Sequence, residues 1–226
     1  MAKLVLIHKP DSIYDDEPDV VYDFPRSYLK AVEAAVGDWI VYYEPVRAGA
    51  RGYFATAQID SVTPKPGTEG RYLAWIAPGT FLPFDGPVPR LVEGRPWEAA
   101  LTAADGTPVR GGAVQLAVRR LPEAEFERIV AHGLPADLIA QEAARYGDVP
   151  EGVADPAAPF ERPVIERLQQ RPYRDAVFRR RVREAYGYRC AMSGLMLRNG
   201  GGRPEVQAAH IRPVHRGGSD FVRNGL

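Results

Sequence analysis

The chain has almost no cysteine: Cys190 is the only one among its 226 residues. A single thiol cannot form an intramolecular disulfide, and it excludes the paired Cys-x-x-Cys knuckles that hold structural zinc. We therefore predict no structural zinc. We interpret Cys190 as a small, buried, apolar residue on a strand rather than as a catalytic thiol.

Long hydrophobic runs are also missing. No stretch of about eighteen apolar residues, the length of a membrane-spanning helix, occurs in the sequence. Residues 1–9 become polar too early for a signal peptide. With 45% hydrophobic residues the chain can still bury a core in one or two domains. The sequence predicts a soluble, cytoplasmic protein with no membrane partner.

The net charge is zero, but the charges are unevenly divided. Residues 161–226 contain 14 arginines, no lysine and 6 acidic residues, a balance of +8, so the preceding residues carry −8. Arginine forms a planar fork that matches phosphate, which favours a polyanion-binding surface at the C-terminal end. A solvated helix face is the alternative interpretation. The candidates for DNA-phosphate binding are Arg179, Arg180, Arg181, Arg183, Arg212 and His215.

Residues 1–120 contain short apolar runs bounded by Gly and Pro. Runs over 39–43, 53–59 and 72–76 are rich in aromatic and β-branched residues, which predicts strands. A helix is expected over 27–36, because Pro25 precedes it and Gly37 follows it.

Residues 121–173 have a different pattern, typical of a helical and Pro-rich linker. Helices are predicted over 122–132 and 136–146, each followed by a glycine. Residues 148–163 carry four prolines and predict a hinge. Residues 174–226 form the third region, and no internal repeat is found.

The third region carries two motifs in a recognisable order. The segment 208–213 reads Ala-Ala-His-Ile-Arg-Pro, a Gly-Gly turn follows at 217–218, and Asn-Gly-Leu stands at 224–226. Upstream, a basic segment beginning at Phe178 leads into Tyr-Gly-Tyr-Arg-Cys-Ala-Met-Ser-Gly over 186–194. Residues 174–226 thus resemble the HNH endonuclease family.

The resemblance implies a ββα-metal module with a basic helix, then a strand and turn over 186–194. It implies that His210 is the general base that activates water, and that Asn224 positions this histidine or binds the metal. Mg²⁺ or Mn²⁺ is the expected cofactor, because hard cations suit phosphodiester hydrolysis. Asn224 has an alternative interpretation as an ordinary helix cap. His8, His132 and His215 are interpreted as structural or surface residues, with His215 also able to face a phosphate.

Two positions depart from the family pattern. The last family histidine, expected in a helix after Asn-Gly-Leu, has no counterpart before Leu226. Ala209 stands where many such sites carry an acidic metal ligand. We expect the cation to be weakly held and this 226-residue form to be impaired or inactive, whether the chain is shortened or naturally reduced.

The N-terminal region has its own resemblance. Gly-Asp-Trp-Ile-Val-Tyr-Tyr-Glu-Pro over 37–45, followed by Gly-Tyr-Phe-Ala-Thr-Ala-Gln-Ile over 52–59, is similar to the strand pair of EVE domains in the PUA-like superfamily. This implies a small β-barrel that binds nucleic acid and holds a flipped, modified base in an aromatic cage. Stacking on aromatic walls recovers the cost of extruding the base.

The residues nominated for this modified-base pocket are Tyr22, Asp23, Phe24, Trp39, Tyr43 and Trp75, with Asp38 as a second candidate for reading a base amino edge. Alternate residues of a barrel strand face the core, so packing is the competing interpretation for each aromatic. Asp38 is also typical of a turn.

Together the patterns predict an α+β protein: an N-terminal PUA/EVE-like β-barrel over 1–120 with flanking helices, a linker over 121–173 and a partial HNH module over 174–226. The hypothesis is a modification-dependent restriction endonuclease that acts on double-stranded DNA containing modified cytosine. A non-cleaving reader of modified nucleic acid is the alternative, and RNA modification is a third interpretation. Whether the chain forms a homodimer is left open.

Overall fold

The computed structural model describes residues 2–9, 14, 16–45, 52–109, 111–135, 138–146, 164–200, 202 and 204–226. The chain divides into two compact units. The N-terminal unit comprises Met1–Ala77 and Pro83–Leu134, and the C-terminal unit comprises Pro78–Leu82 and Pro135–Leu226. The α+β class is confirmed. The expected hinge over 148–163 lies outside the described residues.

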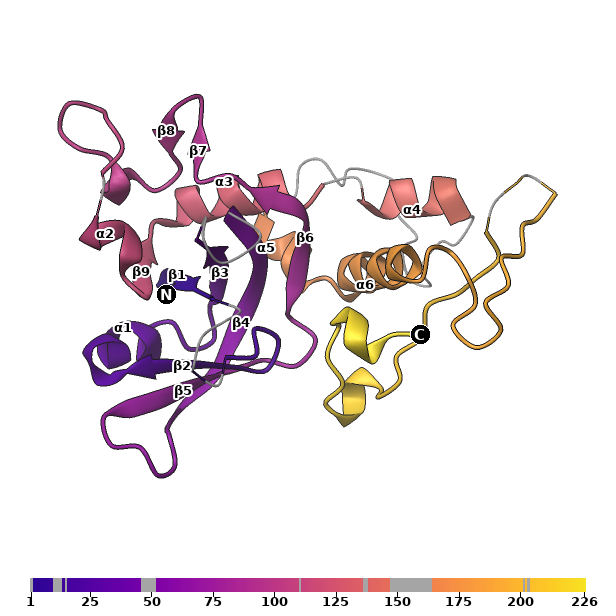
Figure 1. Cartoon of the computed structure of the whole chain (residues 1–226), viewed down its shortest axis with the longest axis horizontal. Coiled ribbons are helices and arrows are strands. Elements are labelled where there is room, and N and C mark those ends of the chain that lie inside the picture. The colour runs from indigo at the N-terminus through magenta and orange to yellow at the C-terminus, as the bar shows by residue number, and fades with distance from the viewer. Residues whose placement is uncertain are drawn as a thin grey trace. The chain divides into compact units, whose positions relative to one another are not determined.

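The N-terminal unit is built on a mixed sheet of seven strands, drawn from indigo to magenta in Figure 1. The strands are β1 (Lys3–Ile7), β2 (Val21–Pro25), β3 (Trp39–Glu44), β4 (Gly52–Pro64), β5 (Arg71–Ile76), β6 (Leu82–Val88) and β9 (Val118–Leu121). Their order is β2-β5-β4-β3-β1-β9, with β6 also paired to β4. β1 and β3 are parallel, whereas β1–β9, β2–β5, β3–β4 and β4–β5 are antiparallel. A separate hairpin joins β7 (Leu91–Val92) to β8 (Arg95–Pro96).

Short helices flank this sheet. They are η1 (Arg26–Tyr28), α1 (Leu29–Glu33), η2 (Ala99–Leu101), α2 (Gly112–Gln115) and α3 (Glu123–Gly133). The C-terminal unit contains α4 (Leu138–Tyr146), α5 (Val164–Gln169), α6 (Arg171–Ala185), η3 (Val214–Arg216) and η4 (Val222–Asn224).

The elements predicted from aromatic and β-branched runs are confirmed as β3, β4 and β5, and the two helices predicted after residue 121 are confirmed as α3 and α4. The helix expected over 27–36 is shorter, because regular helix ends at Glu33 and the chain turns at Gly37, whose φ is +78°. A glycine tolerates this left-handed conformation without steric cost.

The prediction of a closed β-barrel is wrong, because the sheet is open. β4 changes partner from β3 to β5 at an irregularity between Ile59 and Ser61. This break in register bends the sheet. In the described residues no ladder joins the end strands β2 and β9. Instead, the Tyr22 hydroxyl of β2 donates to the backbone oxygens of Ile7 and Ala117, each 3.0 Å away. The gap is bridged by a side chain rather than by strand pairing.

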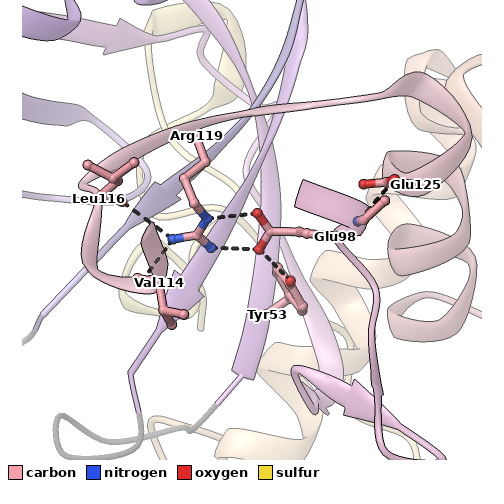
Figure 2. Close-up of polar contacts among 7 residues, drawn as sticks. Tyr53, Glu98, Val114, Leu116, Arg119 and Glu125 are labelled. Atoms are coloured by element: carbon pink, nitrogen blue, oxygen red, sulfur yellow. Dashed lines mark hydrogen bonds and ion pairs between the residues drawn. The ribbon is translucent and has the colours of Figure 1, made fainter. Parts of the chain in front are cut away.

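A buried polar cluster fastens the loop before η2 to the sheet (Figure 2). Glu98 accepts two bonds from the Arg119 guanidinium, at 2.7 and 2.6 Å, and one from the Tyr53 hydroxyl at 2.7 Å. Glu98 is 1% exposed. Burial would lower the pKa of Arg119, but the bonds to Glu98 outweigh it and raise that pKa. Burial, reinforced by Glu98, raises the pKa of Tyr53. The cluster is therefore a charged pair with its hydrogen bonds filled.

In the C-terminal unit α6 packs against α4, α5 and η4. Its buried residues include Tyr173, Phe178 and Val182. A Cβ built on Gly225 would lie 2.2 Å from the Val182 side chain. Only glycine at this position allows the C-terminal segment to lie this close to α6.

The prediction of a strand over 186–194 is wrong. These residues form turns after α6, because Tyr188 adopts a φ of 59° and the Gly194 amide donates to the Cys190 oxygen. Cys190 is consequently part-exposed and lies outside any strand, which also corrects its predicted burial.

Candidate active site

The segment around His210 folds into a short hairpin with the segment around Gly225. His210 and Gly225 form an antiparallel bridge. On either side, Ala209 and Leu226 exchange two backbone hydrogen bonds of 2.8 and 3.0 Å, and the Ile211 amide donates to the Asn224 oxygen at 2.8 Å. Figure 1 shows this C-terminal segment, in yellow, beside α6.

Asn224 closes the loop of the hairpin. Its Oδ1 accepts from the Arg212 amide at 2.9 Å, and its Nδ2 donates to the oxygens of Arg212 and Ser219 at 2.9 and 2.8 Å. Gly218 lies within this loop, where a Cβ would approach the Arg212 oxygen to 1.8 Å. The amide of Asn224 therefore holds the backbone that follows His210.

His210 itself is held on two sides. Its ring stacks on Phe178 of α6, with centroids 3.7 Å apart and planes 4° from parallel. Its Nε2 lies 2.7 Å from Oδ1 of Asp220. The His210 side chain is 20% exposed and the Asp220 side chain 4% exposed. The imidazole is thus fixed in plane and in rotation while part of it still reaches solvent.

Asp220 is a residue to which sequence reasoning assigned no role. Burial raises the pKa of its carboxyl, although the hydrogen bond and charge of His210 oppose the shift. Asp175 adds to the rise and Arg174 opposes it. Its place after the Gly-Gly turn was visible in the sequence, but contact with His210 depends on a loop path that residue spacing alone does not reveal.

A cleft of about 640 Å³ opens beside His210, entirely within the C-terminal unit. It is lined by Pro78, Gly79, Arg171, Arg174, Asp175, Phe178, Arg179, Ala208, His210, Pro213, Val214, His215 and Asp220. Arg174 donates to the Gly79 oxygen at 3.1 Å, and Arg171 lies 3.6 Å from Asp175 in an exposed ion pair. The cleft therefore places an imidazole among several cationic groups.

The predicted phosphate-binding residues fall into two groups. Arg212 and His215 are exposed on the hairpin, and Arg179 and His215 line the cleft. Arg180 and Arg183 of α6 are buried, 6% and 3% exposed, and Arg183 Nε donates to the Val206 oxygen at 3.1 Å. Burial lowers the pKa of Arg180 and of half-buried Arg181. The arginine-rich helix is thus partly an internal element and not a uniform basic face.

The predicted base-pocket residues are mostly buried. Tyr22, Phe24, Trp39 and Tyr43 are at most 3% exposed, whereas Trp75 is 37% exposed and donates to the Thr63 hydroxyl. Asp23 is buried and accepts from Lys65 and Arg71, each at 2.7 Å. Burial would raise the Asp23 pKa, but these two partners outweigh it and lower that pKa. Buried Asp38 pairs with Lys3. Of the nominated residues, Trp75 alone presents a large surface to solvent.

Within the described ranges, no group of three or more His, Cys, Asp or Glu side chains is arranged to hold a metal ion. Both polar atoms of the Asn224 amide, expected from the resemblance as a metal ligand, bond to the hairpin backbone.

Comparisons with known proteins leave the family open. No family model matches the chain, and no curated protein matches it. Among solved structures, the NMR structure of Rpa0253 from Rhodopseudomonas palustris is similar, at 16% identity and a TM-score of 0.39, over 59% of this chain and 93% of that one. In the described part of the chain, no helix has both the length and the apolar character needed to cross a membrane.

Proposed function

We propose that the chain is a DNA endonuclease of the HNH type, in which the cleft of the C-terminal unit hydrolyses phosphodiester bonds. The observation that carries the proposal is the placement of His210: a fixed, part-exposed imidazole on a hairpin, in a cleft shared with Arg171, Arg174, Arg179 and His215. Hydrolysis needs a base for water and positive groups for the phosphate.

In the proposed reaction, His210 accepts a proton from water as the water oxygen attacks phosphorus. The bond between phosphorus and the leaving oxygen breaks, and the leaving oxygen takes a proton from solvent. Mg²⁺ or Mn²⁺ dependence is part of the proposal. We assign no step to the cation, and because Ala209 stands where many HNH sites carry an acidic metal ligand, we expect slow cleavage.

We further propose that cleavage depends on a modified cytosine read by the N-terminal unit, in the manner of EVE and other PUA-like domains. Because four of the nominated aromatics lie in the core, the reading surface in this proposal includes exposed Trp75. A flipped base stacked on such a ring gains about 1 to 3 kcal/mol.

The test uses the full chain in excess over supercoiled plasmid with unmodified cytosine, 5-methylcytosine or 5-hydroxymethylcytosine, with Mg²⁺, Mn²⁺ or EDTA. We expect nicking or cutting of a modified plasmid that needs the cation and is lost in His210→Ala. His132→Ala, which changes an exposed histidine of α3 in the N-terminal unit, is the matched control. Cleavage by His210→Ala at the wild-type rate would contradict the assignment.

The second candidate is a reader that binds modified DNA without cutting it. Ala209, which stands where many HNH sites carry an acidic metal ligand, and the bonding of the Asn224 amide to the hairpin backbone favour this function. Tighter binding of modified than of unmodified duplex, with no cleavage under any cation, would support it over the endonuclease.

A further inference from the structure

We propose that Asp220 is the positioning residue of His210, whose buried carboxylate accepts the Nε2 proton and leaves Nδ1 as the proton acceptor of the ring. The inference rests on the proposed function, in which His210 is the base. It assigns a role to a residue that neither the HNH resemblance nor the sequence pattern singled out.

Asp220 and His210 are joined by a short hydrogen bond. Oδ1 of Asp220 lies 2.7 Å from Nε2 of His210, a length typical of a charge-assisted hydrogen bond. An ionised carboxylate can only accept, so Nε2 must carry the proton that the pair shares. In a neutral imidazole the other ring nitrogen then has a free lone pair and can take a proton from water.

The ring of His210 also cannot easily turn away. Phe178 covers one face of the imidazole at 3.7 Å, and Phe178 is itself 2% exposed on α6. The backbone of His210 is held by its bridge to Gly225, which lies against Val182. Ring plane and backbone are therefore both set by residues other than Asp220. What remains for Asp220 is the choice of tautomer and rotamer.

The carboxylate of Asp220 is buried. Asp220 is 5% exposed and comes close to Gly79, where a Cβ would lie 3.5 Å from its second oxygen. Arg174 and Asp175 of α6 act on it with opposite signs. A carboxylate held in a low-dielectric position interacts more strongly with a neighbouring imidazolium than one in water. Asp220 therefore also stabilises the positive charge that His210 acquires when it takes a proton.

The first readout is the ring proton of His210 and does not depend on nuclease activity. In ¹⁵N-labelled full chain, the four histidines are assigned by single replacements. We expect an Nε2-bound proton on His210 that exchanges slowly with water and resonates downfield. Asp220→Asn, which removes the charge but keeps an acceptor oxygen, should move this resonance upfield. Asp220→Leu, which removes the acceptor, should abolish it. Asp175→Asn, at the neighbouring carboxylate, should leave the proton protected.

The second readout is the rate at saturating protein on a cleavable duplex. We expect Asp220→Asn to slow single-turnover cleavage by about 10²- to 10⁴-fold, the range for a general base and its support, with DNA affinity nearly unchanged. The spectrum of Asp220→Asn away from the hairpin reports whether this variant is folded, so the conclusion does not depend on Asp220→Leu folding.

The outcomes separate the two proposals. A protected Nε2 proton that responds to Asp220→Asn, without cleavage by any variant, would support the pairing and reject the endonuclease. Cleavage lost in His210→Ala but retained in folded Asp220→Asn would keep the endonuclease and overturn the role of Asp220. An unprotected Nε2 in the wild type would overturn the pairing directly.

Discussion

The two units use their charged residues in different ways. In the N-terminal unit, three buried acids form ion pairs: Asp23 with Lys65 and Arg71, Asp38 with Lys3, and Glu98 with Arg119. In the C-terminal unit, arginines and two histidines, His210 and His215, line an open cleft together with Asp175 and the buried Asp220.

The difference separates charges that are paired inside the fold from charges that line the candidate site. A buried pair with its bonds filled has no capacity left for a ligand, and its loss costs folding energy. A part-exposed imidazole bonded to a buried carboxylate keeps one nitrogen for a reactant. We therefore expect replacements in the buried ion pairs of the first unit to change stability, and replacements of the cleft residues of the second unit to change catalysis or DNA affinity.

The largest expected effect is the loss of the Glu98 pair. Glu98→Ala leaves the Arg119 charge buried without its partner and should lower the free energy of unfolding by about 3–5 kcal/mol. Urea denaturation of the full chain measures this change. Exposed Glu69→Ala is the control and should stay within about 0.5 kcal/mol of wild type. Equal urea midpoints for the two variants would contradict the stabilising role of the Glu98–Arg119 pair.

Asp23 gives the next effect, and it depends on pH. Asp23→Asn removes two charge-assisted bonds and should destabilise the chain by about 2–3 kcal/mol at neutral pH. The pKa of Asp23 is lower in the folded chain than in the unfolded one. Its contribution is therefore present above the unfolded pKa of about 4 and is lost as pH falls through the folded pKa. The stability difference between wild type and variant should shrink on acidification. A difference that grew instead would contradict the ion-pair role of Asp23.

Asn224 tests the hairpin of the second unit. Asn224→Ala removes three hydrogen bonds and should cost about 1–2 kcal/mol, discounted because the loop is partly exposed. The Arg212 amide donates to Oδ1 of Asn224, so its hydrogen exchange should accelerate in the variant, while exchange in β3 stays unchanged. Gln207→Ala, at an exposed position nearby in sequence, is the control. Unchanged protection of the Arg212 amide would show that Asn224 does not hold this backbone.

The smallest expected effect concerns phosphate contacts and distinguishes exposed Arg212 from buried Arg183. Arg212→Gln, at an exposed site, should reduce the slope of log affinity for DNA against log salt by about 1, the effect of one lost phosphate contact. Arg183→Gln, at a buried site, should lower stability and leave the slope unchanged. A reduced slope for Arg183→Gln and an unchanged slope for Arg212→Gln would show that Arg183, and not Arg212, contacts phosphate.

Local chemistry explains what could be predicted from the sequence. The strands β3, β4 and β5 follow from aromatic and β-branched runs, and α3 and α4 follow from helical segments that are each followed by a glycine in the sequence. The open sheet could not be predicted, because it depends on where β4 changes partner. Burial of Arg183 and exposure of Trp75 depend on tertiary packing that composition does not encode. The order of the motifs nominated His210 and Asn224 as site residues. The contact of Asp220 with His210 depends on the path of the loop, which the sequence does not reveal.

The central claim is that His210 performs the chemistry in a cleft whose other basic groups hold DNA. Single-turnover cleavage of a modified-cytosine duplex with Mg²⁺, measured across protein concentrations, tests it most directly. We predict that His210→Ala lowers the saturated rate by about 10²- to 10⁴-fold with unchanged half-saturation. His215→Ala should instead raise the half-saturating concentration and keep the saturated rate. Equal saturated rates for wild type and His210→Ala would contradict the account.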